Sequence, residues 1–154
     1  FSNTGVYVGT LPLTTNATTL AVNAISTNAL TIGTAIVANT TSVSANNITL
    51  TNFTETAYTN NGIGSSFTVD LSLGTVQILN LSSTSTITMP TTTAGKSFTM
   101  VLKTGTGGYT VTWSTVAWPA GVAPTLTSTA SKKDILSFFS DGTSWYGVVV
   151  GQNY

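Results

Sequence analysis

The stretch that decides the fold is Ile135-Leu136-Ser137-Phe138-Phe139-Ser140-Asp141-Gly142-Thr143-Ser144-Trp145-Tyr146-Gly147-Val148-Val149-Val150. Two apolar runs flank an Asp-Gly dipeptide, and this pattern is typical of a β-hairpin with a tight turn. Both runs carry apolar residues on both faces of the expected strand. We therefore expect this hairpin in the centre of a β domain or at an interface between subunits.

Further short strands precede this hairpin. Apolar residues alternate with polar ones, which is the pattern of strands with one buried face. Thr104–Gly108 reads as a hairpin turn between two of them. Seven or so short strands joined by Gly and Pro turns predict an all-β sandwich or jelly roll over residues 62–154. The expected strands are Phe67–Leu73, Val76–Leu81, Ile87–Met89, Phe98–Leu102 and Tyr109–Trp113.

Residues 1–61 have a different character, with Glu55 as their only charged residue. Short apolar doublets such as Leu30 with Ile32 and Ile48 with Leu50 are separated by Thr, Asn and Ser clusters. A weak repeat relates Val6–Thr10 to Leu30–Thr34, which favours an elongated stack. Strands this short cannot bury an apolar face alone. We expect a repetitive β shaft of three intertwined chains, with a loose Thr-rich linker as the alternative.

The composition restricts the partners of this chain. Charged residues make up 5% of the 154 residues, compared with roughly 25% in ordinary soluble domains. The chain has four Lys and no Arg, so we expect no basic patch able to bind nucleic acid. No apolar run approaches the roughly 18 residues of a membrane-spanning helix, so no membrane insertion is expected. The chain begins at Phe1, and we expect it to be part of a longer protein.

Catalytic equipment is scarce in the sequence. The absence of His and Cys removes the most common general base and the thiolate nucleophile. A carboxylate pair could only come from Glu55, Asp70, Asp134 and Asp141, each of which has a structural explanation such as the Asp-Gly turn. Lys96 and Ser97 are neighbours in a strand and point to opposite faces, so they form no dyad. We expect no catalytic residue, no cofactor and no metal site.

The aromatic residues are the remaining candidates for binding. Tyr109 and Trp113 occupy the apolar face of an alternating strand, so we expect them in the core. Trp118 lies in Val116-Ala117-Trp118-Pro119-Ala120-Gly121, which has the composition of a loop. It is the Trp that we expect to be exposed. An exposed indole among amides and hydroxyls suits a carbohydrate, so Trp118 is the candidate ligand-binding residue.

The second region contains five motifs in a fixed order: Ala94–Lys103, Gly107–Trp113, Trp118–Gly121, Ala123–Thr127 and Phe138–Gly147. In order and spacing, these motifs resemble a module of tail-fibre and other virion proteins of tailed bacteriophages. The first region is similar in composition to the Asn/Thr-rich β repeats of fibres from marine and cyanobacterial phages.

This resemblance implies a homotrimeric fibre on the surface of a virion, with a shaft and a distal β domain that attaches to the host, often through surface glycans. It assigns no contact residue. Two alternatives remain open: a head-fibre or capsid-decoration protein with an architectural role among other virion proteins, and a carbohydrate-binding module of a larger secreted protein. The oligomeric state separates the last alternative from the other two.

Overall fold

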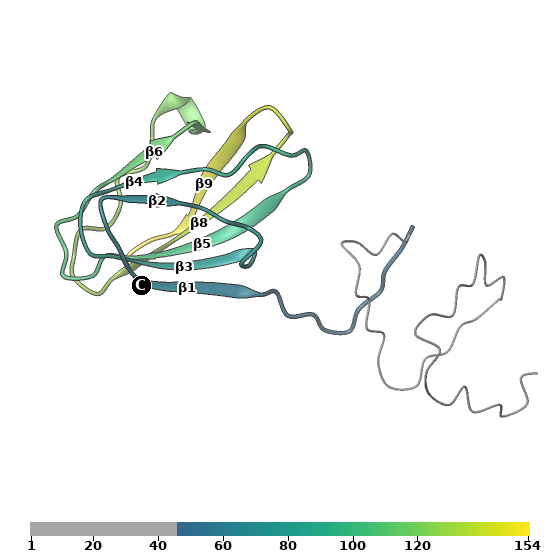
Figure 1. Ribbon diagram of the computed structural model, residues 1–154, viewed down its shortest axis with the longest axis horizontal. Helices are drawn as coiled ribbons and strands as arrows, with labels where there is room; N and C mark the ends of the chain where they lie inside the picture. Colours follow the sequence, from purple (N-terminus) through teal and green to yellow (C-terminus); the bar gives the residue numbers. More distant parts are fainter. Residues whose placement is uncertain (1–45) are drawn as a thin grey trace, which may run out of the picture. The chain divides into compact units, whose positions relative to one another are not determined.

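The computed structural model describes residues 46–154 (Figure 1). Most of the predicted shaft therefore lies outside the described residues, including its doublets from Val6 to Ile32. Of those doublets only Ile48 and Leu50 are described, and residues 46–56 form no strand within one chain. A compact unit begins at Thr49, and its first strand, β1 (Ala57–Ile63), spans the boundary expected at residue 61.

The described region is all-β, as predicted, and consists of two sheets that face each other (Figure 1). The larger sheet has the order β1-β3-β5-β8-β9-β7 and the smaller one β2-β4-β6. One short 3-10 helix, η1 (Pro119–Gly121), follows β7. The remaining strands are β2 (Ser66–Thr68), β3 (Val76–Leu81), β4 (Ser85–Thr88), β5 (Ser97–Lys103), β6 (Val111–Ser114), β7 (Val116–Ala117), β8 (Lys133–Ser140) and β9 (Trp145–Gly151).

The first six strands form three successive turns of chain, each contributing one strand to the larger sheet and the next to the smaller one. As a result β1, β3 and β5 pair in parallel, and so do β2, β4 and β6. A jelly roll would pair its strands antiparallel. Alternation of apolar and polar residues is the same in both arrangements, so the sequence pattern identifies strands without fixing their direction.

The hairpin predicted at Thr104–Gly108 is wrong. β5 pairs with β3 and β8, whereas β6 pairs with β4 in the other sheet. The segment between them is a crossover, and the close approach of other backbone explains Gly105 and Gly107. A Cβ on Gly105 would lie 2.1 Å from the Leu81 carbonyl oxygen, and one on Gly107 would lie 2.8 Å from that of Ser128. These two glycines are needed where the chain crosses from one sheet to the other, and not for a hairpin turn within one sheet.

The strand predicted over Phe67–Leu73 is shorter than expected, because β2 ends at Thr68. The carboxylate of Asp70 accepts hydrogen bonds from the backbone N–H and the hydroxyl of Ser72, at 2.9 and 2.7 Å. These bonds favour a turn over a continued strand. Gly74 (φ 152°) then returns the chain to the larger sheet, passing so close to Thr56 that a Cβ would meet its carbonyl oxygen at 2.4 Å.

The hairpin predicted at Asp141-Gly142 is confirmed. β8 and β9 pair antiparallel, and Gly142 has φ 97°. Asp141 Oδ1 accepts hydrogen bonds from the backbone N–H groups of Thr143 and Ser144, each at 2.8 Å. The prediction of a central position is also confirmed, since β8 lies between β5 and β9.

The core lies between the two sheets. Its centre is the stacked pair Phe98 and Phe138, whose ring centroids are 4.7 Å apart. Trp113 and Tyr109 are half-buried and pack against this core, in line with their predicted role. The fully covered apolar side chains are Ile63, Val69, Leu79, Leu81, Ile87, Met89, Phe98, Met100, Leu102, Leu136, Phe138 and Trp145.

Candidate functional site

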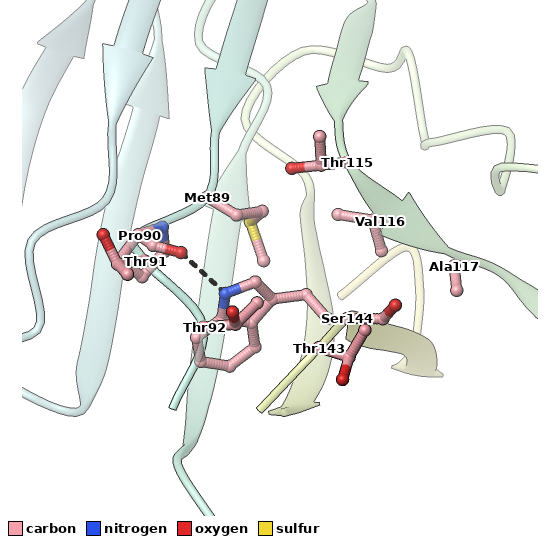
Figure 2. A pocket seen from close by; sticks show the side chains of 10 residues that line it. Met89, Pro90, Thr91, Thr92, Thr115, Val116, Ala117, Thr143 and Ser144 are labelled. Carbon is pink, nitrogen blue, oxygen red and sulfur yellow. Dashed lines mark hydrogen bonds between the residues drawn. The ribbon is translucent and has the colours of Figure 1, made fainter. Parts of the chain in front are cut away.

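A spacious hollow lies beside the turn between β8 and β9, where the end of β4 meets the link between β6 and β7 (Figure 2). Its volume is about 710 Å³ and it opens to solvent. Figure 2 shows Pro90 and Thr91 on one side and Thr115, Val116 and Ala117 on the other. Segments far apart in the sequence therefore form its walls. The lining residues are Met89, Pro90, Thr91, Thr92, Thr115, Val116, Ala117, Thr143, Ser144 and Trp145.

The indole of Trp145 fixes one side of this hollow. Its Nε1–H donates a hydrogen bond to the carbonyl oxygen of Pro90 at 2.8 Å, drawn in Figure 2. The ring meets Phe98 edge-on with centroids 5.3 Å apart, and the residue is 1% exposed. Trp145 is therefore a rigid part of the wall and ties the loop after β4 to the start of β9.

Thr115 stands on the rim in a strained conformation. Its φ of 56° lies in the left-handed region, which is rare for a β-branched residue. Such strain costs of order 1–3 kcal/mol and concentrates at functional sites. The side chain of Thr115 donates a hydrogen bond to the carbonyl oxygen of Ser114 at 2.8 Å. The turn lets β6 and β7 belong to different sheets and leaves Thr115 exposed at the hollow.

The chemistry of this hollow is that of an uncharged hydroxyl-rich surface. Five of its lining side chains are Thr or Ser and the others are apolar, so none of these described residues carries a titratable group. Hydroxyls both donate and accept hydrogen bonds, which suits a polyhydroxyl ligand. Apolar wall with a few polar groups is the usual composition of small-ligand sites. The hollow is therefore suited to binding a neutral saccharide.

Trp118, the predicted ligand-binding residue, lies outside this hollow. It occupies the loop between β7 and η1, as expected, but its ring is half-buried. The ring packs on Trp113 and Phe138, with centroid distances of 5.3 and 5.9 Å. Its Nε1–H is buried and has no hydrogen-bond partner among the described residues. The ring of Trp118 thus packs on the core, and its Nε1–H is an unpaired buried donor within the described region.

The four carboxylates are held separately by neutral donors. Glu55 accepts a hydrogen bond from Thr75, and Asp70 and Asp141 are bound within their own turns, which lowers the pKa of both aspartates. The carboxylate of Asp141 also accepts a hydrogen bond from the exposed Tyr146 hydroxyl, at 2.9 Å. This bond raises the pKa of Tyr146. Asp70 and Asp141 thus stabilise turns, and Glu55 binds a residue distant in the sequence.

Asp134 is the buried carboxylate of the domain, with 1% of its surface exposed. It accepts hydrogen bonds from the backbone N–H groups of Thr127 and Asn153, at 2.7 and 3.0 Å, and from Gln152 Nε2 at 3.2 Å. Burial opposes ionisation, but these hydrogen bonds outweigh it and hold the pKa of Asp134 below its ordinary value. The carboxylate joins the loop before β8 to the end of the chain.

Two further kinds of feature are absent from the described region. Residues 46–154 contain no group of three or more His, Cys, Asp or Glu side chains placed to hold a metal ion. No helix within this region has the length and apolar character needed to cross a membrane. Comparison of the chain with protein-family models, with curated proteins and with solved structures finds no match.

Proposed function

We propose that this chain is a structural protein of a virion fibre, without enzymatic activity, which assembles as a homotrimer and meets the host surface through its β domain. The proposal rests on the sequence resemblance to tailed-phage fibres and on the apolar side chains that one chain leaves uncovered. The more specific reading of residues 1–61 as an intertwined shaft belongs to this proposal.

The observation that carries the proposal is the segment before β1. Its large apolar side chains are more than half exposed: Ile48 59%, Leu50 60% and Phe53 67%. Burying such side chains stabilises an assembly by about 25 cal/mol per Å². The segment 46–54 contains no charged residue, so identical copies can meet there without repulsion between like charges. Copies of the same segment are therefore the occupants that best fit it.

The outer face of the larger sheet supports the same conclusion. Phe139 on β8 lies directly opposite Tyr146 on β9, and the two side chains are 50% and 45% exposed. Val148 and Val150 extend this apolar surface along β9, with 48% and 61% exposed. Contiguous exposed apolar patches mark interaction surfaces in soluble proteins. This surface offers a second contact between copies.

Host attachment is the second part of the proposal. The hydroxyl-lined hollow is suited to sugar hydroxyls. None of its described lining residues has a titratable side chain, which fits binding rather than catalysis. We therefore assign host glycans as the ligand class of this domain.

The mass of the full chain in solution tests the assembly. We expect a trimer by light scattering, and we expect the double variant Leu50→Ser, Phe53→Ser to dissociate or lose stability. Val122→Ser is the matched control, because Val122 is a 71% exposed apolar residue in a loop outside the segment. A stable monomer would contradict the fibre proposal.

Two competing functions have distinct outcomes. A monomer that still binds glycans would favour a carbohydrate-binding module of a secreted protein. A trimer located on the capsid by electron microscopy of the particle would favour a head fibre or decoration protein. A trimer located on the tail supports the proposed function.

A further inference from the structure

The charged residues of the domain are sorted to opposite ends of its strands. Lys103, Lys132 and Lys133 lie at the end where β5 finishes and β8 begins, together with the buried Asp134. The other end, where β3 and β5 begin, has Lys96 with the three remaining carboxylates: Glu55, Asp70 and Asp141. The formal charges are therefore +2 (3 − 1) at the first end and −2 (1 − 3) at the second. The fold brings Lys103 to the adjacent residues Lys132 and Lys133, because β5 pairs with β8.

Two of these lysines stand next to each other. Lys103 on β5 and Lys133 on β8 are direct register partners in an antiparallel pair, so their side chains share the outer face of the sheet. Like charges placed directly opposite each other destabilise a sheet. The third lysine differs, because Lys132 Nζ donates a hydrogen bond to the Asn153 carbonyl oxygen at 3.3 Å. The pair Lys103 and Lys133 thus forms a local positive charge that a bound anion would offset.

On the neighbouring strand β3, an Asn side chain lies beside the pair Lys103 and Lys133. Asn80 on β3 is the register partner of Lys103, and its Nδ2 donates a hydrogen bond to the Asn61 carbonyl oxygen at 2.8 Å. Its Oδ1 is buried and has no hydrogen-bond donor among the described residues. An unsatisfied buried acceptor costs free energy.

Two hollows share Asn80 and Lys103 as lining residues. One, of about 210 Å³, is also lined by Lys133, Thr59 and Asn60. The other, of about 330 Å³, reaches Tyr109, whose hydroxyl is 2.9 Å from that of Thr106. Sites for small ligands are typically about 300–1,000 Å³, a range that includes the second hollow. They combine two ammonium groups, amides, hydroxyls and an aromatic ring.

We propose that the groove formed by these two hollows binds an acidic saccharide. The anionic group, a carboxylate or a phosphate, lies between Lys103 and Lys133. The sugar hydroxyls bind the amide of Asn80, and a sugar face lies against Tyr109. The groove is at the opposite end of β8 from the hydroxyl-lined hollow beside Thr143 and Ser144, so it is a separate site.

The size and charge of the groove favour a saccharide over nucleic acid. Proteins that bind nucleic acid electrostatically make about 6–10 phosphate contacts, whereas two lysines are available here. Their ammonium groups act as point charges with three donors each, which suits a single anionic substituent. The amides and the aromatic ring recognise the neutral remainder of the sugar.

The test is binding of the full chain to an array of saccharides. The array contains glucuronate, galacturonate, sialic acid and sugar phosphates, each beside its neutral parent. We expect retention of acidic sugars over their parents at low salt, and comparison of the carboxylate and phosphate members distinguishes the two anionic groups. The double variant Lys103→Gln, Lys133→Gln is expected to lose about tenfold or more in affinity, because charge-assisted hydrogen bonds are the strong ones. Its melting temperature serves as the check on folding.

Lys96→Gln is the matched control, since it removes one lysine at the opposite end. Equal binding of acidic and neutral sugars would overturn the inference, as would the absence of binding or unchanged affinity in the double variant. Tighter binding of a single-stranded oligonucleotide than of any acidic sugar would overturn it in favour of nucleic acid. Saccharide binding can be measured whatever the oligomeric state of the chain. A monomer that binds acidic sugars would therefore contradict only the fibre proposal. A trimer that does not bind them would contradict only this inference.

Discussion

The indole of Trp118 lies directly over Gly147. A Cβ at position 147 would stand 2.6 Å from Cζ3 and 2.7 Å from Cη2 of that ring, and 3.0 Å from Cε1 of Phe138. Several glycines of the domain have a positive φ, but Gly147 does not. Close approach of the aromatic rings, rather than backbone conformation, therefore requires glycine in the middle of β9.

Gly147→Ala is expected to destabilise the domain by about 1–3 kcal/mol, the usual cost of inserting a methyl group into a packed core. The indole of Trp118 must move away from Phe138, so tryptophan fluorescence should change as well. Denaturant unfolding and emission spectra measure the two effects. Gly64→Ala is the control, because a Cβ there meets no atom within 4 Å. Equal stability of both variants would contradict the packing described.

Trp118→Ala is expected to weaken binding to host glycans while leaving assembly intact. The half-buried ring also contributes to packing, so the variant should lose some stability. Trp118→Phe separates the effects, because Phe keeps an aromatic ring and removes the unpaired Nε1–H. Reduced binding in both variants, measured on immobilised glycans, would support a role for that donor. Unchanged binding in Trp118→Ala would leave the residue a structural role only.

Thr115→Gly is expected to stabilise the domain by about 1 kcal/mol, because glycine adopts the left-handed conformation without the penalty that a β-branched residue has. The same change removes one hydroxyl from the rim of the hollow. If the strain serves a binding site, glycan affinity should fall as stability rises. Thermal unfolding and glycan binding test this trade-off, and Thr112→Gly, in β6 itself, should destabilise. Loss of stability in Thr115→Gly would show that the conformation is not strained.

Asp134→Asn is expected to destabilise the domain at pH 7 by about 1.5–3 kcal/mol, the range for hydrogen bonds to a charged group. Because the folded pKa of Asp134 lies below the ordinary value of 3.8, its contribution is present above that pH. It is lost as the pH falls through the folded pKa. The difference in unfolding free energy between wild type and variant should therefore shrink below pH 3.8.

Unfolding in denaturant at pH 7 and at pH 3 measures this difference. Asp70→Asn is the comparison for burial, because that carboxylate is exposed and bound only within its turn. Its pKa is lowered as well, so its effect on the unfolding free energy should be smaller at pH 7 and should also shrink at pH 3. If the difference in unfolding free energy between wild type and Asp134→Asn did not depend on pH, the charge of Asp134 would not be what stabilises its hydrogen bonds.

The sequence alone determined that the described region is all-β, where its final hairpin turns, and which side chains face inward. These properties depend on residues close together in the chain: alternation along a strand, and a carboxylate two or three residues from the N–H groups it binds. The same local logic placed Trp118 in a loop. It could not place the ring, because the packing partners Phe138 and Gly147 come from two later strands.

The tertiary structure decided the direction and the neighbours of the strands. Apolar alternation is identical in parallel and antiparallel pairs, so it did not reveal that β5 and β6 belong to different sheets. It could not bring Lys103 beside Lys133, since only the register of β5 with β8 does so. For the same reason the walls of both candidate sites were invisible in the sequence. Pairing across the sheet, rather than any local pattern, creates them.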